Sequence, residues 1–194
     1  MLGVILAGGE STRMGKDKAT VEVAGRTMLE WVTAAVVEAG LEPAVAGRVE
    51  GPADVEAFPD PGAPHRGPLA GLVGAMHHHP DTPAVLVSVD QPWVRPATLR
   101  RLAGMDGALP VVPVEAGVRQ TTCAFYPPNI VGAAETELAG GGSLQSLLDV
   151  VSFTPVVDWH PWGEDGRSWY SVNTPADLKN GLARFGPPGV LSGE

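Results

Sequence analysis

Short apolar runs alternate along the chain with longer segments of helical spacing, and this alternation constrains the fold most strongly. Residues 84–89, Ala-Val-Leu-Val-Ser-Val, form a near-continuous apolar run that is typical of a central strand in a parallel sheet. Residues 27–39 carry apolar side chains at helical spacing and are followed by Gly40, a common helix end. Strand–helix alternation with short connections predicts an α/β fold, a three-layer sandwich with a mostly parallel central sheet.

The same patterns predict the individual elements. Strands are expected over residues 4–7, 43–46, 55–58, 84–89, 109–114, 122–126 and 153–157. Helices are expected over residues 27–39, 69–76, 96–102 and 175–185, with two more beginning at Asn129 and Ser143. Glycines and prolines are spread through the connections, so residues 1–185 are expected to form a single domain. Residues 186–194 are expected to form a loose tail.

Composition argues against several classes of protein. The formal net charge is −9 and no long basic run occurs, which argues against nucleic acid as a partner. A single cysteine, Cys123, excludes an internal disulfide framework and a cysteine-rich zinc site. No stretch of about eighteen apolar residues occurs, so no membrane span is expected. The apolar N-terminus is too short for a signal peptide and lacks a basic region, so a cytoplasmic protein is expected.

The segment after the first expected strand carries the most chemical information. Residues 6–18 read Leu-Ala-Gly-Gly-Glu-Ser-Thr-Arg-Met-Gly-Lys-Asp-Lys. Ligands gather at the carboxyl ends of parallel strands, where glycines let backbone N–H groups approach an anion. Arg13, Lys16 and Lys18 add three cations, so the segment predicts a polyphosphate site. The alternative is an ordinary glycine-rich turn with solvated charges.

Two other phosphate-binding motifs do not fit this loop. The spacing from Gly9 to Gly15-Lys16 is one residue too long for a P-loop, and Asp17 follows where Ser or Thr is needed. The dinucleotide fingerprint Gly-x-Gly-x-x-Gly is absent from this turn. An NAD-dependent oxidoreductase is therefore disfavoured.

Two aspartates close expected strands. Asp90 ends the strand at residues 84–89 and should face the same sheet edge as the first loop. Magnesium prefers oxygen ligands and commonly joins one or two carboxylates to substrate phosphates, which makes Asp90 a candidate metal ligand. A turn or helix-capping role before Pro92 is the alternative. Asp60 follows the strand expected at residues 55–58, and the small residues at 67–71 would let a flat group or a sugar lie against the backbone, with an ordinary packed turn as the alternative.

The last expected helix begins with a capping pattern. Thr174 precedes Pro175, and Asp177 completes something close to a capping box. Capping explains most of this segment without any function. The preceding residue, Asn173, could then point into the site.

Taken together, these segments resemble the nucleotidyltransferase family typified by molybdenum cofactor guanylyltransferase. Residues 6–18 match the family's Leu-Ala-Gly-Gly-x-Ser-x-Arg-Met-Gly-x-Asp-Lys pattern at every defined position. Residues 67–71 match its Gly-Pro-Leu-Ala-Gly element, and Asp60 stands seven residues before Gly67, as the family's nucleotide-contacting aspartate does. Asp90 falls on its metal aspartate, and residues 173–178 match its Asn-Thr-Pro-x-x-Leu element. The resemblance covers nearly the whole chain in the same order.

The resemblance implies a Rossmann-like nucleotidyltransferase that transfers GMP from GTP to the molybdopterin cofactor, with Mg²⁺ as cofactor and pyrophosphate as product. It implies that the N-terminal half binds the nucleotide through Leu6, Ala7, Gly8, Gly9, Lys18, Asp60 and Asp90. Arg13, Lys18 and Asp90 would be catalytic, and Asp90 would hold the metal. The C-terminal half would present the acceptor, through Thr121 and Asn173. Transient contact with other cofactor-biosynthesis proteins or apoenzymes is also implied.

This chain departs from the family pattern at three places. Ser88-Val89 replaces Pro-Cys before Asp90, and Ser171 replaces the first asparagine of the last motif. Ala46-Gly47 occupies the region where the family has an asparagine, which bears on base specificity. The alternatives are cytidylyl transfer to molybdopterin, nucleotidyl transfer to a sugar phosphate, and a non-catalytic nucleotide-binding protein.

Three further features favour structural roles. Adjacent helical residues point about 100° apart, so His77, His78 and His79 are expected at a solvated helix end rather than around one metal ion. Cys123 lies in an apolar run and is expected to be a buried thiol. Trp159, Trp162 and Trp169 surround a Gly-Glu-Asp-Gly loop and favour a hydrophobic cluster beneath it over an acceptor pocket.

Overall fold

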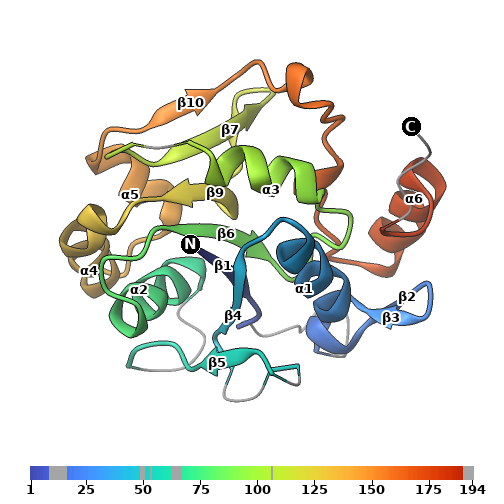
Figure 1. Cartoon of the computed structure of the whole chain (residues 1–194), viewed down its shortest axis with the longest axis horizontal. Helices are drawn as coiled ribbons and strands as arrows, with labels where there is room; N and C mark the ends of the chain where they lie inside the picture. Colours follow the sequence, from blue (N-terminus) through green and yellow to red (C-terminus); the bar gives the residue numbers. More distant parts are fainter. Residues whose placement is uncertain (9–16, 49–50, 53, 63–66, 106, 190–194) are drawn as a thin grey trace.

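The computed structural model describes residues 1–8, 17–48, 51–52, 54–62, 67–105 and 107–189. The strands of its main sheet are β1 (Leu2–Leu6), β4 (Glu42–Ala46), β5 (Glu56–Phe58), β6 (Ala84–Ser88), β7 (Val111–Glu115), β8 (Val118–Arg119), β9 (Cys123–Tyr126) and β10 (Thr154–Val156). The helices are α1 (Met28–Glu38), α2 (Pro68–His78), α3 (Pro96–Ala103), α4 (Val131–Ala139), α5 (Leu144–Val150) and α6 (Pro175–Phe185). Figure 1 shows them in sequence colours.

The main sheet has the strand order β10-β7-β9-β6-β1-β4-β5, with β8 paired to β7. Strands β6, β1, β4 and β5 run parallel to one another, as β10 does to β7. The strand predicted at 122–126 forms β9, which runs antiparallel to both β6 and β7. The predicted mostly parallel α/β sheet is therefore confirmed, with an antiparallel strand inserted beside its parallel half.

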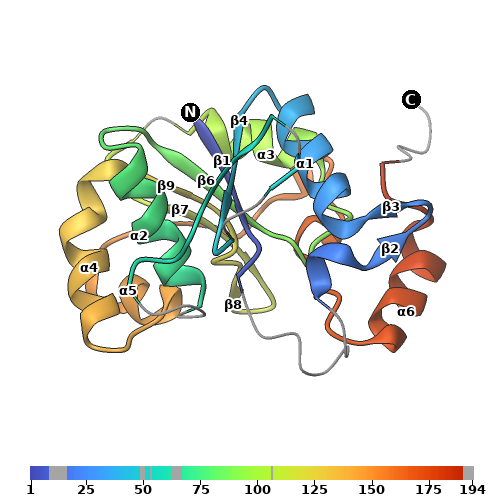
Figure 2. The same cartoon turned by 90° about the horizontal axis from the view of Figure 1, so that it is seen from below.

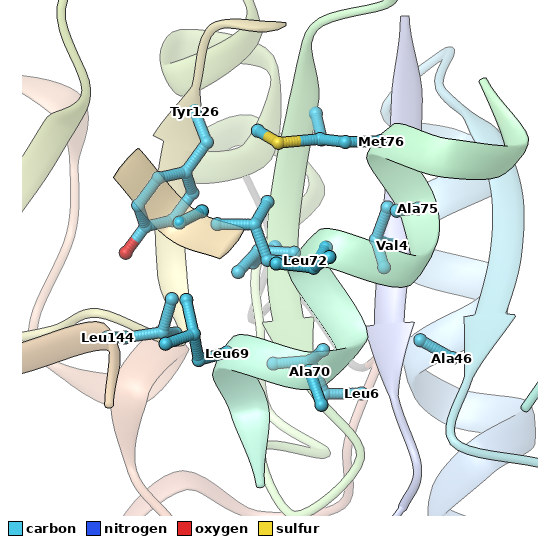
Figure 3. Close-up of a cluster of buried hydrophobic side chains, with 14 of the residues drawn as sticks. Val4, Leu6, Ala46, Leu69, Ala70, Leu72, Ala75, Met76, Tyr126 and Leu144 are labelled. Atoms are coloured by element: carbon cyan, nitrogen blue, oxygen red, sulfur yellow. The ribbon is translucent and has the colours of Figure 1, made fainter. Parts of the chain in front are cut away.

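Helices cover both faces of the sheet, which confirms the three layers (Figures 1 and 2). Side chains alternate along β1, so Val4 and Leu6 join the core cluster beneath α2, α4 and α5. Ile5 joins the opposite cluster beneath α1 and α3. Figure 3 shows how Leu69 and Leu72 of α2 pack over the first of these faces, together with Tyr126 of β9.

A small hairpin, β2 (Glu22–Val23) with β3 (Arg26–Thr27), was not predicted from the sequence. It lies beside α6 and the start of α1, at one end of the sandwich (Figures 1 and 2). A separate apolar cluster joins these elements and includes Val23, Met28, Trp93, Val172 and Phe185. This cluster fastens the C-terminal helix next to the turn that follows β6.

The first part of the predicted loose tail makes contacts. The Trp93 indole Nε1 donates a hydrogen bond of 2.8 Å to the Gly186 carbonyl. Gly189 lies against Trp31, because a Cβ at Gly189 would come within 2.6 Å of the indole ring. Residues 190–194 lie outside the described residues, so a loose tail remains a prediction there.

The residues expected to be structural are found in structural roles. Cys123 is buried, and burial raises the pKa of its thiol. Trp159 and Trp169 pack edge to face in the core beneath the 163–166 loop. His77 and His79 lie at the end of α2 and pair with Glu135 and Glu56, each at 2.6 Å. Within the described part of the chain, no group of three or more His, Cys, Asp or Glu residues could hold a metal ion.

None of the helices in the described segments is long and apolar enough to cross a membrane.

Candidate functional site

Four parallel strands end at one edge of the sheet, and their ends are tied by backbone hydrogen bonds. Ala7 N donates to Ala46 O at 2.9 Å, joining the ends of β1 and β4. Val89 N donates to Leu6 O at 3.0 Å, joining β6 to β1. The predicted site residues Leu6, Ala7, Gly8, Asp60 and Asp90 all stand at these strand ends. The shared parallel direction therefore gathers them at one edge, as ligand sites of open α/β sheets require.

Lys18, Asp90 and Asn173 meet at this edge, although they come from three distant parts of the chain. Lys18 Nζ lies 3.1 Å from Asp90 Oδ2 and donates a 2.7 Å hydrogen bond to Asn173 Oδ1. The Lys18 and Asp90 side chains are 21% and 16% exposed, so the ion pair is partly shielded from solvent. The sequence predicted all three as site residues, and the structure brings them into contact.

Local structure positions Lys18 at the start of a short 3-10 helix, η1 (Lys18–Thr20). The Asp17 carboxylate caps this helix by accepting a hydrogen bond from Ala19 N at 3.0 Å. Asp17 also pairs with Arg48, the second residue after β4. The cap fixes the backbone from which the Lys18 side chain reaches toward β6.

Asp90 has one carboxylate oxygen that pairs with Lys18 and one that does not. Its Oδ1 atom is buried and has no hydrogen-bond partner among the described residues. Its main-chain carbonyl accepts a 2.8 Å hydrogen bond from Val172 N, which fixes Asp90 next to the residue before Asn173. A buried acceptor left unpaired is unfavourable, so this oxygen fits a cation that binds together with a ligand.

The Asp90 oxygen suits Mg²⁺ in particular. Magnesium is usually bound by one or two carboxylates, with substrate phosphates and water as the other ligands. A single protein carboxylate beside the predicted phosphate loop is therefore a sufficient donor set. Asp90 remains a proposed ligand, and the predicted turn before Pro92 is also present, since Gln91 N donates to Ser88 O at 3.0 Å.

The Asp60 carboxylate lies next to a close contact between the backbones of Gly8 and Gly47. A Cβ at Gly47 would lie 2.5 Å from Gly8 Cα, and Gly47 has a φ of +85°. A Cβ at Gly8 would lie 3.2 Å from Asp60 Oδ2, and one at Gly47 would lie 3.3 Å from Asp60 Oδ1. Gly47 belongs to the Ala46-Gly47 segment, the region where the family pattern led us to expect an asparagine, and this packing has no room for a side chain at Gly47.

Thr121 stands beside the same edge, two residues before the first residue of β9. It is buried, and its carbonyl accepts a 2.9 Å hydrogen bond from the Tyr126 hydroxyl. Arg119, two residues before Thr121, is held by Gln145 and Asp149 of α5, each at 2.8 Å. These contacts give the segment a rigid base, and its role toward an acceptor remains a prediction.

Sequence reasoning missed Gln91, which is almost fully buried beside Asp90. Its Oε1 accepts a 3.0 Å hydrogen bond from Ser88 N, and its Nε2 lies 3.4 Å from Thr122 Oγ1. Gln91 therefore ties the end of β6 to the start of β9. The signal available was a glutamine between a strand-ending aspartate and Pro92, where an exposed turn residue would be more usual.

Asn173 combines the two roles that the sequence left open. Its backbone N donates to Asp177 Oδ2 at 3.0 Å, and Thr174 completes a capping box at the start of α6. The pKa of Asp177 is lowered mainly by the hydrogen bond from the Thr174 hydroxyl, and also by the one from the Asn173 backbone N–H. The cap leaves the Asn173 side chain directed at Lys18.

Residues 9–16 lie outside the described residues, and they include the predicted site residues Gly9 and Arg13 as well as Lys16. Their predicted part in nucleotide binding and catalysis stays a prediction. The described part of the loop consists of Leu6, Ala7 and Gly8 on one side and Asp17 and Lys18 on the other.

Comparisons of sequence find molybdenum cofactor guanylyltransferases among the similar proteins. A family model described as "MobA-like NTP transferase domain" matches residues 3–156. A molybdenum cofactor guanylyltransferase of Rhizobium meliloti (strain 1021) is 37% identical over 195 residues, which cover 93% of this chain and 73% of that protein. A probable molybdenum cofactor guanylyltransferase of Natronomonas pharaonis is 30% identical over 198 residues, covering 94% of this chain and 97% of that protein.

A solved structure with the same fold is the molybdopterin-guanine dinucleotide biosynthesis protein A of Archaeoglobus fulgidus. The TM-score is 0.77 at 23% identity, over 93% of this chain and 96% of that one. The likeness shows that the layers and strand order described above are those of a solved protein.

Proposed function

The chain belongs to the MobA-like NTP transferase family and is a nucleotidyltransferase, and we propose that its reaction is guanylyl transfer from GTP to the molybdopterin cofactor. An oxygen of the acceptor's terminal phosphate attacks the α-phosphorus of GTP. The bond from that phosphorus to the bridging oxygen of the β-phosphate breaks, and pyrophosphate leaves with the electron pair. The contact of Lys18 with Asp90 and Asn173 at the carboxyl edge of the sheet is the observation that carries this proposal.

Catalysis of this kind of transfer depends mainly on alignment and on stabilisation of charge. The backbone at Leu6, Ala7 and Gly8 stands where it can line the nucleotide, and Gly8 has no Cβ to keep a phosphate away. Lys18 would neutralise charge on the α-phosphate and the leaving pyrophosphate, because its ammonium is held at this edge by two partners. Arg13 is expected to act with Lys18.

Asp90 would hold Mg²⁺ through the carboxylate that already attracts the Lys18 ammonium. When bound, the ion would supply positive charge beside the triphosphate. This matters in a chain whose formal net charge is −9, since a triphosphate would otherwise meet a repulsive protein. The partly buried site strengthens such charge interactions relative to water.

Asp60 and the paired glycines form the other side of the proposed nucleotide pocket. The N-terminal half would therefore bind GTP, while Asn173 and the segment around Thr121 would present the molybdopterin acceptor from the C-terminal half. We further expect a cytoplasmic enzyme that meets other cofactor-biosynthesis proteins or apoenzymes transiently.

A turnover panel tests the proposal. Pyrophosphate release is measured with GTP, CTP, ATP and UTP, each with Mg²⁺ and with or without the molybdopterin cofactor. Release only with GTP and the acceptor together is expected. Asp90→Asn should abolish this turnover, and Asp158→Asn, at an exposed aspartate, serves as the matched control. Nucleotide binding without pyrophosphate release in the presence of any acceptor would instead identify a non-catalytic binding protein.

Cytidylyl transfer is the second candidate, and one observation keeps it open. Ala46 and Gly47 occupy the region where the family pattern has an asparagine and offer no polar side chain, so base selection must come from other groups. Faster turnover with CTP than with GTP in the same panel would favour this candidate. If a sugar phosphate is the acceptor, pyrophosphate is released when a sugar phosphate is added with the nucleotide, and not when molybdopterin is added.

A further inference from the structure

A cavity of about 170 Å³ lies between α1, the 92–96 segment and the residues that follow α6. The residues of its lining that bear on its chemistry are Arg26, Trp31, Glu38, Trp93, Arg95 and Arg167. The described residues that line it include none of Lys18, Asp60, Asp90, Thr121 and Asn173. The cavity is thus a feature separate from the proposed nucleotide site.

Two indole rings give the cavity fixed apolar walls. Trp31 Nε1 donates a 2.7 Å hydrogen bond to Val23 O, and Trp93 Nε1 donates a 2.8 Å hydrogen bond to Gly186 O. Trp93 is only 3% exposed and packs against α6, where a Cβ at Gly181 would come within 2.4 Å of its ring. Both N–H groups are satisfied by backbone, which holds the rings in place, and Trp31, which is only partly buried, can offer a ligand part of its ring.

Two arginines bring positive charge to the lining, with Glu30 close enough to Arg26, and Asp165 to Arg95, to interact with them electrostatically. Arg26 Cζ lies 4.8 Å from the centre of the Trp31 ring. Arg95 donates to the Gly163 carbonyl through Nη1, while its Nε is buried and has no hydrogen-bond partner among the described residues. Within the described part of the chain, neither Arg26 nor Arg95 forms an ion pair.

The other charged residues of the lining already have partners. Arg167 is paired with Asp165 at 2.8 Å, and the Glu38 carboxylate lies 3.9 Å from Arg100. The positive charge of Arg26 and Arg95 is therefore concentrated at this cavity, in a chain whose overall charge is negative.

We propose that this cavity binds a small organic anion, whose ring lies against Trp31 while its carboxylate or phosphate is bound by Arg26 and Arg95. Arginine is suited to both acids, since its planar fork can donate two parallel hydrogen bonds. The volume is below the range of roughly 300–1,000 Å³ typical of sites for drug-sized ligands, which limits the occupant to about one ring and its acid group. The inference does not depend on the proposed function.

Calorimetric titration tests this proposal with two probes, phenyl phosphate and benzoate, which separate phosphate from carboxylate recognition. Benzyl alcohol serves as the uncharged probe. For so few atoms a dissociation constant on the order of 1 mM is expected for at least one acid, and no binding for the alcohol. Arg26→Gln should weaken binding about fivefold or more, since it removes an exposed charge without disturbing the core. Arg101→Gln, at an exposed arginine of α3 outside the lining, should leave binding unchanged.

A third variant separates this cavity from the nucleotide site, where a phosphate could also bind. Lys18→Ala should leave phenyl phosphate affinity unchanged if the anion lies between Arg26 and Arg95. Loss of binding in Lys18→Ala with full binding in Arg26→Gln would overturn the proposal. The proposal would also be overturned if neither acid binds at a concentration 20-fold above the expected dissociation constant of about 1 mM. Turnover is not needed for any of these measurements, so their outcome is independent of the guanylyltransferase assignment.

Discussion

At the scale of single residues, the proposed site joins side chains that are far apart in the sequence and that the fold of the backbone brings together. Lys18 and Asn173 are 155 positions apart, yet their side chains are 2.7 Å from each other. Asp90 joins them because its own carbonyl accepts from Val172 N, one residue before Asn173. The contact between Lys18, Asp90 and Asn173 therefore depends on the hydrogen bond that holds the segment before α6 next to the end of β6.

Lys18→Ala should lower the rate of the chemical step about a hundredfold, as expected when one preorganised charge donor is removed from a transfer reaction. Single-turnover pyrophosphate release measures this step directly. Lys179→Ala, at an exposed lysine of α6, is the matched control and should turn over at the wild-type rate. Near-normal turnover in Lys18→Ala would speak against the catalytic role of this ammonium.

Gly47→Ala should destabilise the fold and weaken nucleotide binding together. The new Cβ would collide with Gly8 and would also need a left-handed backbone, which alone is unfavourable by roughly 1–2 kcal/mol. Gly117→Ala is the matched control, because Gly117 has a φ of +80° and no atom within 4 Å of its Cβ position. Chemical denaturation and nucleotide titration of both variants measure the two effects. Equal losses of stability and unchanged nucleotide affinity would show that the Gly8–Gly47 contact has no special importance.

At the scale of elements, the sequence predicted most strands and helices but not every direction or connection. Periodicity distinguishes a strand from a helix, but it carries no information about strand direction, so the antiparallel course of β9 was not predicted. The β2–β3 hairpin has two-residue strands, which are too short to show alternation. The carboxyl-end position of Asp60 and Asp90 was predictable, because it follows from strand ends alone. The contacts of Asp60 with Gly47 and of Asp90 with Lys18 were not predictable, because they depend on tertiary packing.

Helix α6 depends on a close approach to Trp93, which Gly181→Ala tests. A Cβ there would come within 2.4 Å of the indole ring, and overpacking of this kind destabilises by about 1–3 kcal/mol. Gly132→Ala in α4 has no atom within 4 Å of its Cβ and should be neutral or stabilising by up to about 1 kcal/mol. Thermal and urea unfolding of the pair give the comparison, and equal stability of the two variants would contradict this packing role.

At the scale of the whole molecule, stability should fall in acid through carboxylates that the fold keeps ionised. Hydrogen bonds from the Thr174 hydroxyl lower the pKa of Asp177, and hydrogen bonds from Arg167 lower the pKa of Asp165. A lowered folded-state pKa gives stability that is fully present above the ordinary aspartate pKa of about 3.9. That stability is lost as the pH falls through the lower folded-state value.

Asp177→Asn should reduce this dependence, because the capping side chain then has no charge to lose. Urea midpoints at pH 7 and pH 3 measure the difference for the wild type and the variant. We expect a smaller difference in Asp177→Asn and an unchanged one in Asp158→Asn, where the carboxylate is exposed. A variant that loses as much stability between the two pH values as the wild type would show that the cap is not the source.

The central claim is that the sheet edge between Lys18 and Asp90 binds the triphosphate and its divalent cation. A crystal structure of the complex with GTP and Mn²⁺, in which anomalous scattering locates the ion, tests it most directly. We predict that the ion contacts the Asp90 carboxylate and that the phosphates lie along residues 6–8 with the Lys18 ammonium beside them. A nucleotide and ion bound elsewhere, with the Lys18–Asp90 pair intact, would contradict the claim.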